Sequence, residues 1–121
     1  MIDSWTWIEY WRGGRGADEA AEHIEGGEEA LVSTINLVEI YYWGLRFYDK
    51  AFADERLQTV TERCQVIPVE TEIAVEAAKI KKDLKLALAD SIILATARRE
   101  GAGVLTGDDD FKDLKDAIFI H

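Results

Sequence analysis

The sequence predicts an α/β domain of three layers, in which helices cover both faces of a central, mainly parallel sheet. Short apolar runs alternate along the chain with longer stretches whose apolar residues recur at helical spacing. Parallel neighbouring strands need long crossovers, and the helical stretches supply them. The length of 121 residues fits one domain, which we expect to span residues 1–121.

The first third of the chain begins with a very short predicted strand, residues 1–2. An aromatic stretch, residues 5–11, is predicted to be helical and to stop at Gly13 and the glycine after it. Residues 16–25 indicate a polar helix, and residues 30–33 a short buried strand. A strand–helix–strand order is already visible here.

The middle third repeats this order. A helix is predicted from Asn36 to about residue 48, with Asn36 and Glu39 in the pattern of a capping box. A second helix is expected over residues 51–62, and a strand over residues 64–69. Thr71 is then predicted to cap the next helix.

The last third carries the clearest pattern. An Ala-, Ile- and Leu-rich helix is predicted over residues 89–100, and Gly101 is well placed to end it. A strand over residues 103–106, a helical turn near Phe111 and a closing strand over residues 117–120 complete the sheet.

Composition excludes several classes of protein. The chain has 24 Asp and Glu against 14 Lys and Arg, a formal net charge of −10, which argues against holding nucleic acid by bulk electrostatic attraction. A polyanion bridged by metal is not excluded.

A single cysteine, Cys64, forms neither an intrachain disulfide nor a thiolate metal site, and it favours a reducing, cytoplasmic location. The apolar runs are too short to span a membrane.

Four carboxylates follow the predicted strands at one edge of the sheet, where open parallel sheets bind their ligands. They are Asp3, Glu39, Asp90 and Asp108. Asp109 and Asp110 follow the last of them, and we expect at least one of these two to point inward. Each acid taken alone also has a structural explanation, as a turn residue or a helix cap. Four such acids at one edge are harder to explain in that way.

Grouped carboxylates stay ionised together where a hard cation compensates them, and oxygen ligands are those that Mg²⁺ or Mn²⁺ prefers. Such an ion lowers the pKa of a bound water and stabilises a phosphate under attack. The sequence therefore predicts hydrolysis of phosphodiesters.

Two segments resemble a known family. The run Ala89-Asp-Ser-Ile-Ile-Leu-Ala-Thr-Ala-Arg98 and the run Gly101-Ala-Gly-Val-Leu-Thr-Gly-Asp-Asp-Asp-Phe111 are similar to the C-terminal signature of PIN domains, in particular the VapC-type toxin ribonucleases of toxin–antitoxin pairs. Asp3-Ser4 and Asn36-Leu-Val-Glu39 match the earlier acids of that pattern. The first strand is short for this family.

The resemblance implies a PIN-like fold and an endoribonuclease that depends on Mg²⁺ or Mn²⁺. It implies that Asp3, Glu39, Asp90 and Asp108 are catalytic and bind the metal, with Asp110 as an auxiliary ligand. Ser4 and Thr106 match positions where the family has hydroxyl groups, which orient the carboxylates. It also implies an RNA substrate, a homodimer and a small antitoxin protein as partner.

Two alternatives stay open at this point. A PIN-like fold that has lost catalysis would act only as a binding module. A phospho-accepting receiver domain has similar length and sheet type, but Asp3 lacks the acidic neighbour expected there, and Pro68-Val69 stands where the acceptor aspartate belongs.

The tryptophans and lysines have two interpretations. At least two of the four tryptophans are expected in the core, and the others at a partner surface. The lysine run over residues 79–85 either guides a phosphate backbone or forms an ordinary solvated helix face, and we favour the helix face.

Overall fold

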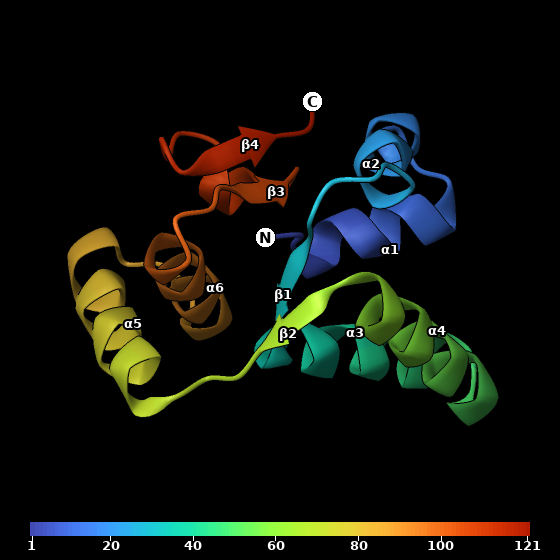
Figure 1. Cartoon of the computed structure of the whole chain (residues 1–121), viewed down its shortest axis with the longest axis horizontal. Coiled ribbons are helices and arrows are strands. Elements are labelled where there is room, and N and C mark those ends of the chain that lie inside the picture. The colour runs from blue at the N-terminus through green and yellow to red at the C-terminus, as the bar shows by residue number, and fades with distance from the viewer.

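The computed structural model describes residues 1–121 and contains a central parallel sheet between two layers of helices (Figure 1). The elements are α1 (Ser4–Arg12), α2 (Ala17–Ile24), β1 (Leu31–Ser33), α3 (Thr34–Phe47), α4 (Lys50–Arg63), β2 (Gln65–Ile67), α5 (Thr71–Leu84), α6 (Leu88–Arg99), β3 (Val104–Thr106), the 3₁₀ turn η1 (Asp109–Phe111) and β4 (Ala117–Phe119). No helix is long and apolar enough to cross a membrane.

The N-terminal residues join two strand pairs into one sheet. β1 pairs with β2 and β3 with β4, both in parallel. The amide of Ile2 donates to the carbonyl of Leu31 at 2.9 Å, and the amide of Leu105 donates to the carbonyl of Met1 at 2.8 Å. The sheet order is therefore β4, β3, residues 1–3, β1, β2. The predicted first strand is reduced to a bridge between Ile2 and Leu105.

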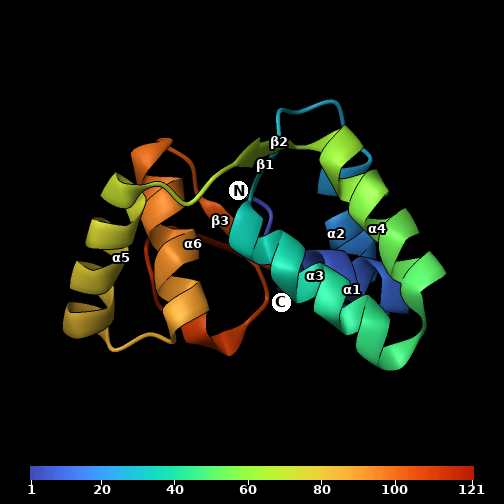
Figure 2. The same ribbon diagram turned by 90° about the horizontal axis from the view of Figure 1, so that it is seen from below.

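The sheet separates two hydrophobic cores, as the predicted three-layer arrangement requires. Met1 and Val104 face the core built with α5, α6 and η1, whereas Ile2 and Leu105 face the core built with α1 to α4. Side chains alternate because successive residues of a strand point to opposite faces. Figure 2 shows the pair α5–α6 on one side of the molecule and α3–α4 on the other.

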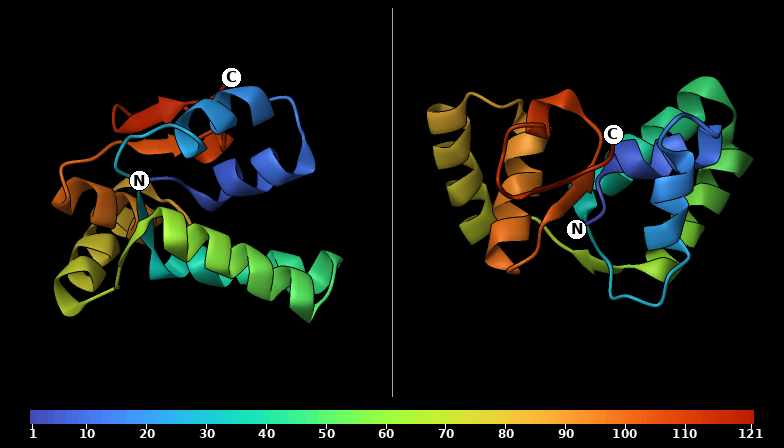
Figure 3. Two further views of the ribbon diagram at one scale, coloured as in Figure 1. Left: turned by 45° about the vertical axis from the view of Figure 1, so that its right-hand side comes forward. Right: turned by 90° about the horizontal axis from the view of Figure 1, so that it is seen from above.

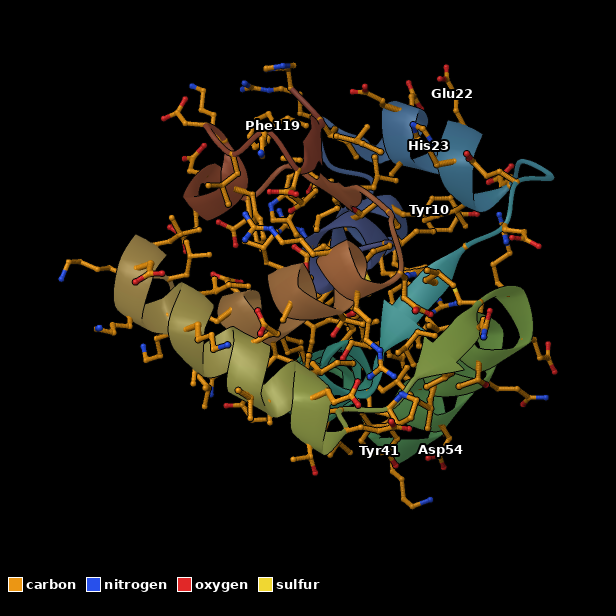
Figure 4. All side chains as sticks on the ribbon, turned by 60° about the vertical axis from the view of Figure 1, so that its left-hand side comes forward. Tyr10, Glu22, His23, Tyr41, Asp54 and Phe119 are labelled. Atoms are coloured by element: carbon orange, nitrogen blue, oxygen red, sulfur yellow. The ribbon has the colours of Figure 1, made fainter.

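The α3–α4 pair packs closely because Gly44 stands at its crossing. A Cβ atom at Gly44 would lie 2.9 Å from the Cα of Ala53, so a larger residue would push the helices apart. Near the same crossing the hydroxyl of Tyr41 donates to Asp54 at 2.6 Å, and Figure 4 shows the two residues side by side.

One tryptophan, Trp7, is completely buried, while Trp5 and Trp11 are partly buried and pack against the same core. Trp11 stacks on Trp43 with ring centroids 5.9 Å apart. The expectation of core tryptophans is therefore correct for α1.

The lysines of α5 are exposed, and Lys79 pairs with Glu76 at 3.2 Å within the helix.

Two predicted helix caps are wrong. Ser33, not Asn36, caps α3: its Oγ accepts the amide of Ile35 at 3.2 Å, and its own amide donates to Asn36 Oδ1 at 2.9 Å. The capping box is thus shifted by three residues, which frees Glu39 from this role. Thr71 begins α5 without capping it, because Glu70 is the cap and makes no side-chain bond there.

The substitution Ser33→Ala tests the observed cap. We expect the free energy of unfolding to fall by about 1 kcal/mol, because the Ile35 amide loses its partner. Urea titration of both proteins measures the change. Thr34→Ala, next to the cap, is the control, and an equal loss in the two variants would contradict the assignment.

Candidate metal centre

Three carboxylates from two elements meet beyond the carboxyl end of β3. Asp90 lies in the first turn of α6, Asp108 follows β3, and Asp110 belongs to η1. Each offers an oxygen, and these oxygens lie within 4.8 Å of one another. Asp90 and Asp108 are distant in the sequence, but they lie close in space because α6 leads directly into β3 and packs against the sheet.

Asp3 lies between β3 and β1, where the order of the strands reverses, and only 3% of it is exposed. Its Oδ1 accepts the amide of Ser4 at 2.8 Å and so caps α1. Its Oδ2 accepts the hydroxyl of Thr106 at 2.8 Å. The Thr106 hydroxyl in turn accepts the amide of Asp108 at 3.0 Å, so this one side chain links two of the acids.

Glu39 reaches the site from the second turn of α3. The hydroxyl of Ser4 donates to Glu39 Oε1 at 2.7 Å. That hydroxyl also accepts from Nδ2 of Asn36 at 3.0 Å, and the same Nδ2 lies 3.5 Å from Asp3 Oδ1. Asn36 therefore connects the cap of α3 to two of the acids.

Asn36 is the site residue that the motif analysis did not single out as functional. It is completely buried, although asparagine has two donors and two acceptor lone pairs to satisfy. The sequence feature that could have identified Asn36 is its position three residues before Glu39, which places both residues on the same face of α3.

Burial and repulsion by neighbouring carboxylates raise the pKa values of Asp3, Glu39 and Asp90. Burial first, then the charges of Glu39 and Asp108, raise the pKa of Asp3 to about 7, against the opposing hydrogen bond from Thr106. The pKa of Asp90 also rises to about 7, through burial and then the charges of Asp108, Asp3 and Asp110. Burial and the charge of Asp108 raise the pKa of Glu39.

None of the five acids forms a salt bridge with Lys, Arg or His. The donor set consists only of carboxylate and hydroxyl oxygens. A divalent cation fits this set, because it would compensate the negative charge of the acids, and the pKa values of Asp3 and Asp90 are otherwise raised to about 7.

The structure thus brings together Asp3, Glu39, Asp90, Asp108 and Asp110, with Ser4 and Thr106 between them. Asp110 is the one of the pair whose carboxylate lies in the cluster, whereas Asp109 lines a separate hollow. The structural explanations hold in part, since Asp3 caps α1 and Asp108 Oδ1 accepts the amide of Asp110 at 2.9 Å. One residue can cap a helix and still belong to the cluster.

Comparison with solved structures gives the same fold. The toxin–antitoxin complex from Klebsiella pneumoniae contains a chain with a TM-score of 0.80 and 23% identity, over 99% of this chain and 96% of that one. VapBC2 from Rickettsia felis, bound to a promoter DNA fragment, gives 0.75 and 17%, over 98% and 95% of the two chains. DNA-bound VapBC from Salmonella typhimurium gives 0.74 and 18%, over 97% and 92%.

No curated protein sequence matches the chain significantly. The family model of the PIN domain, however, matches residues 1–117. This match removes the receiver-domain alternative, and the chain belongs to the PIN domain family.

Proposed function

We propose that this chain is a divalent-metal-dependent endoribonuclease, the toxin of a toxin–antitoxin pair. The observation that carries the proposal is a group of five carboxylates without a cationic partner, in which Asp3 and Glu39 interact electrostatically with the cluster of Asp90, Asp108 and Asp110. The fold shared with chains of VapBC complexes supports it. We further infer that residues 1–121 form one domain.

In this proposal Asp3, Glu39, Asp90 and Asp108 hold Mg²⁺ or Mn²⁺, with Asp110 as an auxiliary ligand. The ion would supply an activated water and charge compensation for the phosphate. Ser4 and Thr106 orient the acids, because each hydroxyl donates to one carboxylate, Glu39 and Asp3 respectively. Asn36 fixes the rotamer of Ser4 through its amide.

A small antitoxin and a second copy of the chain are the proposed protein partners. Apolar side chains exposed on α3 support such contacts, among them Val38, Tyr42 and Leu45. They border a hollow of about 490 Å³ lined only by apolar residues. A second hollow of about 570 Å³ lies between α1 and α3, with Trp43 and Phe47 in its wall. The free cysteine, Cys64, agrees with a cytoplasmic location.

The substitution Asp90→Asn tests the activity. We expect wild type to cleave single-stranded RNA with Mn²⁺ or Mg²⁺ and not with a chelator. Asp90→Asn should lower turnover by at least about 100-fold, because an amide oxygen binds a cation more weakly than a carboxylate does. The protein is assayed free of any co-purified partner.

Asp113→Asn is the matched control, since Asp113 is an exposed aspartate close in sequence but outside the cluster. Full activity in this variant shows that the loss is specific to the site. If wild type and Asp90→Asn cleave equally, the proposal is wrong. If neither cleaves, while Mn²⁺ does not bind to wild type by calorimetry, the chain is instead an inactive binding module.

A further inference from the structure

A hollow of about 540 Å³ lies beside the five carboxylates and is not part of their cluster. The loop after α1 and the ends of β3 and β4 enclose it. Gly107 and Asp109, the chain neighbours of Asp108, form its edge toward the acids. Both views in Figure 3 place the C-terminus next to the α1–α2 segment, which is where this hollow opens.

Three cationic side chains from different segments line this hollow. Arg12 ends α1, Arg15 lies in the loop that follows, and Lys112 comes directly after η1. All three are exposed, and none is in a salt bridge. They are therefore available to an external anion.

Two carboxylates, of Glu9 and Asp109, also line the hollow. Glu9 is already engaged, because its Oε2 accepts the amide of Gly16 at 3.1 Å. Asp109 stands at the edge nearest the cluster. On a chain with a formal net charge of −10, the charged side chains around this hollow carry one more positive than negative charge.

Aromatic rings also line the hollow, among them those of Trp5 and Phe119. A Cβ atom at Gly16 would lie 3.1 Å from Cη2 of Trp5, and one at Gly107 would overlap the same ring. The indole fits in this place because neither position carries a Cβ atom. Phe119, on β4, lies with its ring centroid 5.0 Å from that of His121 (Figure 4 labels Phe119).

We propose that this hollow binds a nucleotide of the RNA strand that flanks the cleaved phosphodiester, an inference that rests on the proposed function. Arg12, Arg15 and Lys112 bind the phosphates, and Trp5 and Phe119 offer faces for a base. Cations along the backbone together with aromatic platforms are the means by which proteins bind single strands without reading sequence.

The sheet register connects the hollow to the acids. Phe119 is paired with Thr106, whose hydroxyl donates to Asp3. An RNA strand bound against Phe119 would therefore lie next to the carboxylates. This explains how an acidic protein holds a polyanion: the attraction is local and does not depend on the net charge.

The double substitution Arg12→Ala/Arg15→Ala tests the site. Affinity for a short fluorescent single-stranded RNA is measured by anisotropy, with chelator, over a range of salt concentrations. We expect Kd to rise at least about tenfold, and the slope of log K against log salt to fall by about 1.4, since each lost phosphate contact on a single strand is worth about 0.7. With Mn²⁺, KM should rise by a similar factor and kcat change by less than about twofold.

The control Arg46→Ala/Lys115→Ala removes the same charge from exposed positions outside the hollow. We expect wild-type affinity and salt slope, and Lys112→Ala alone should lower the slope by about 0.7. If the control weakens binding as much as the double variant, net charge explains the effect and the proposal is overturned.

The two proposals fail in different ways. If wild type cleaves RNA but the double variant keeps its affinity and slope, the hollow is not the binding site and the proposed activity stands. If wild type binds RNA through Arg12 and Arg15 without cleaving it, the activity is wrong and the binding site stands.

Discussion

Acidifying the metal-free protein from pH 8 to pH 5 should stabilise wild type relative to Asp3→Asn, by up to about 2.5 kcal/mol. The pKa of Asp3 is raised from 3.8 to about 7 in the folded state, mainly by burial. Between these values the folded protein binds more protons than the unfolded chain. The contribution of Asp3 is therefore most favourable at acid pH and decreases as the pH rises through 7.

The comparison with Asp3→Asn is needed because another group titrates nearby. Burial lowers the pKa of the Met1 amine, so its contribution to stability changes with pH in the opposite direction. This amine is the same in both proteins and cancels in the difference. Asp90, whose pKa is also raised to about 7, adds to the dependence in both proteins, and less in Asp3→Asn because the charge of Asp3 contributes to that shift.

Divalent metal should remove most of this pH dependence. A cation bound by the cluster favours the ionised carboxylates, so Mn²⁺ should stabilise wild type most at pH 8 and least at pH 5. Urea titrations at several pH values, with Mn²⁺ or with chelator, measure both effects. A wild-type stability that parallels Asp3→Asn over this range, or an equal gain from Mn²⁺ at pH 5 and pH 8, would contradict the prediction.

Replacing Asn36 by alanine should lower the free energy of unfolding by about 3 kcal/mol. The Asn36 side chain is fully buried, and its Oδ1 accepts the amide of Ser33. The variant leaves that amide unpaired, opens a small cavity and releases the Ser4 hydroxyl from its donor. Cleavage should fall as well, since Ser4 then holds Glu39 less firmly.

Urea unfolding and the RNA cleavage assay report the two effects of Asn36→Ala separately. Gln58→Ala is a control of similar chemistry, because Gln58 is exposed on α4 and its side chain donates only to Glu62, at 2.9 Å. A loss of stability no larger than that of the control would show that Asn36 is not central to the fold. Restored stability at high Mn²⁺ with cleavage still low would separate positioning from folding.

Local sequence patterns predicted most helices and strands, but they assigned the caps of α3 and α5 to the wrong residues. The helix over residues 89–100 and the strand over residues 103–106 match α6 and β3 almost residue for residue. The capping box at Asn36 was wrong because α3 begins earlier, where Ser33 at the end of β1 accepts the amide of Ile35 and Asn36 accepts the amide of Ser33. Which residue caps a helix depends on where the preceding strand ends and the backbone turns into the helix. The spacing of residues in the sequence does not show that point.

The first strand shows the same limit. Residues 1–2 carry the apolar pattern of a strand, but they form only a bridge with Leu105. Backbone bonds to β1 and β3 nevertheless make these residues the centre of the sheet. A segment this short is held by its neighbours, so its position follows from the tertiary structure.

The sequence by itself determined the order of strands and helices and the edge of the sheet where the acids collect, because both follow from periodicity and from the parallel crossover. Only the tertiary structure decided that Asp110 rather than Asp109 faces the cluster, and that Asn36 joins it. It also placed Arg12 and Lys112 around one hollow. These relations join segments distant in the chain, and they depend on helix rotation and loop path, which no local pattern encodes.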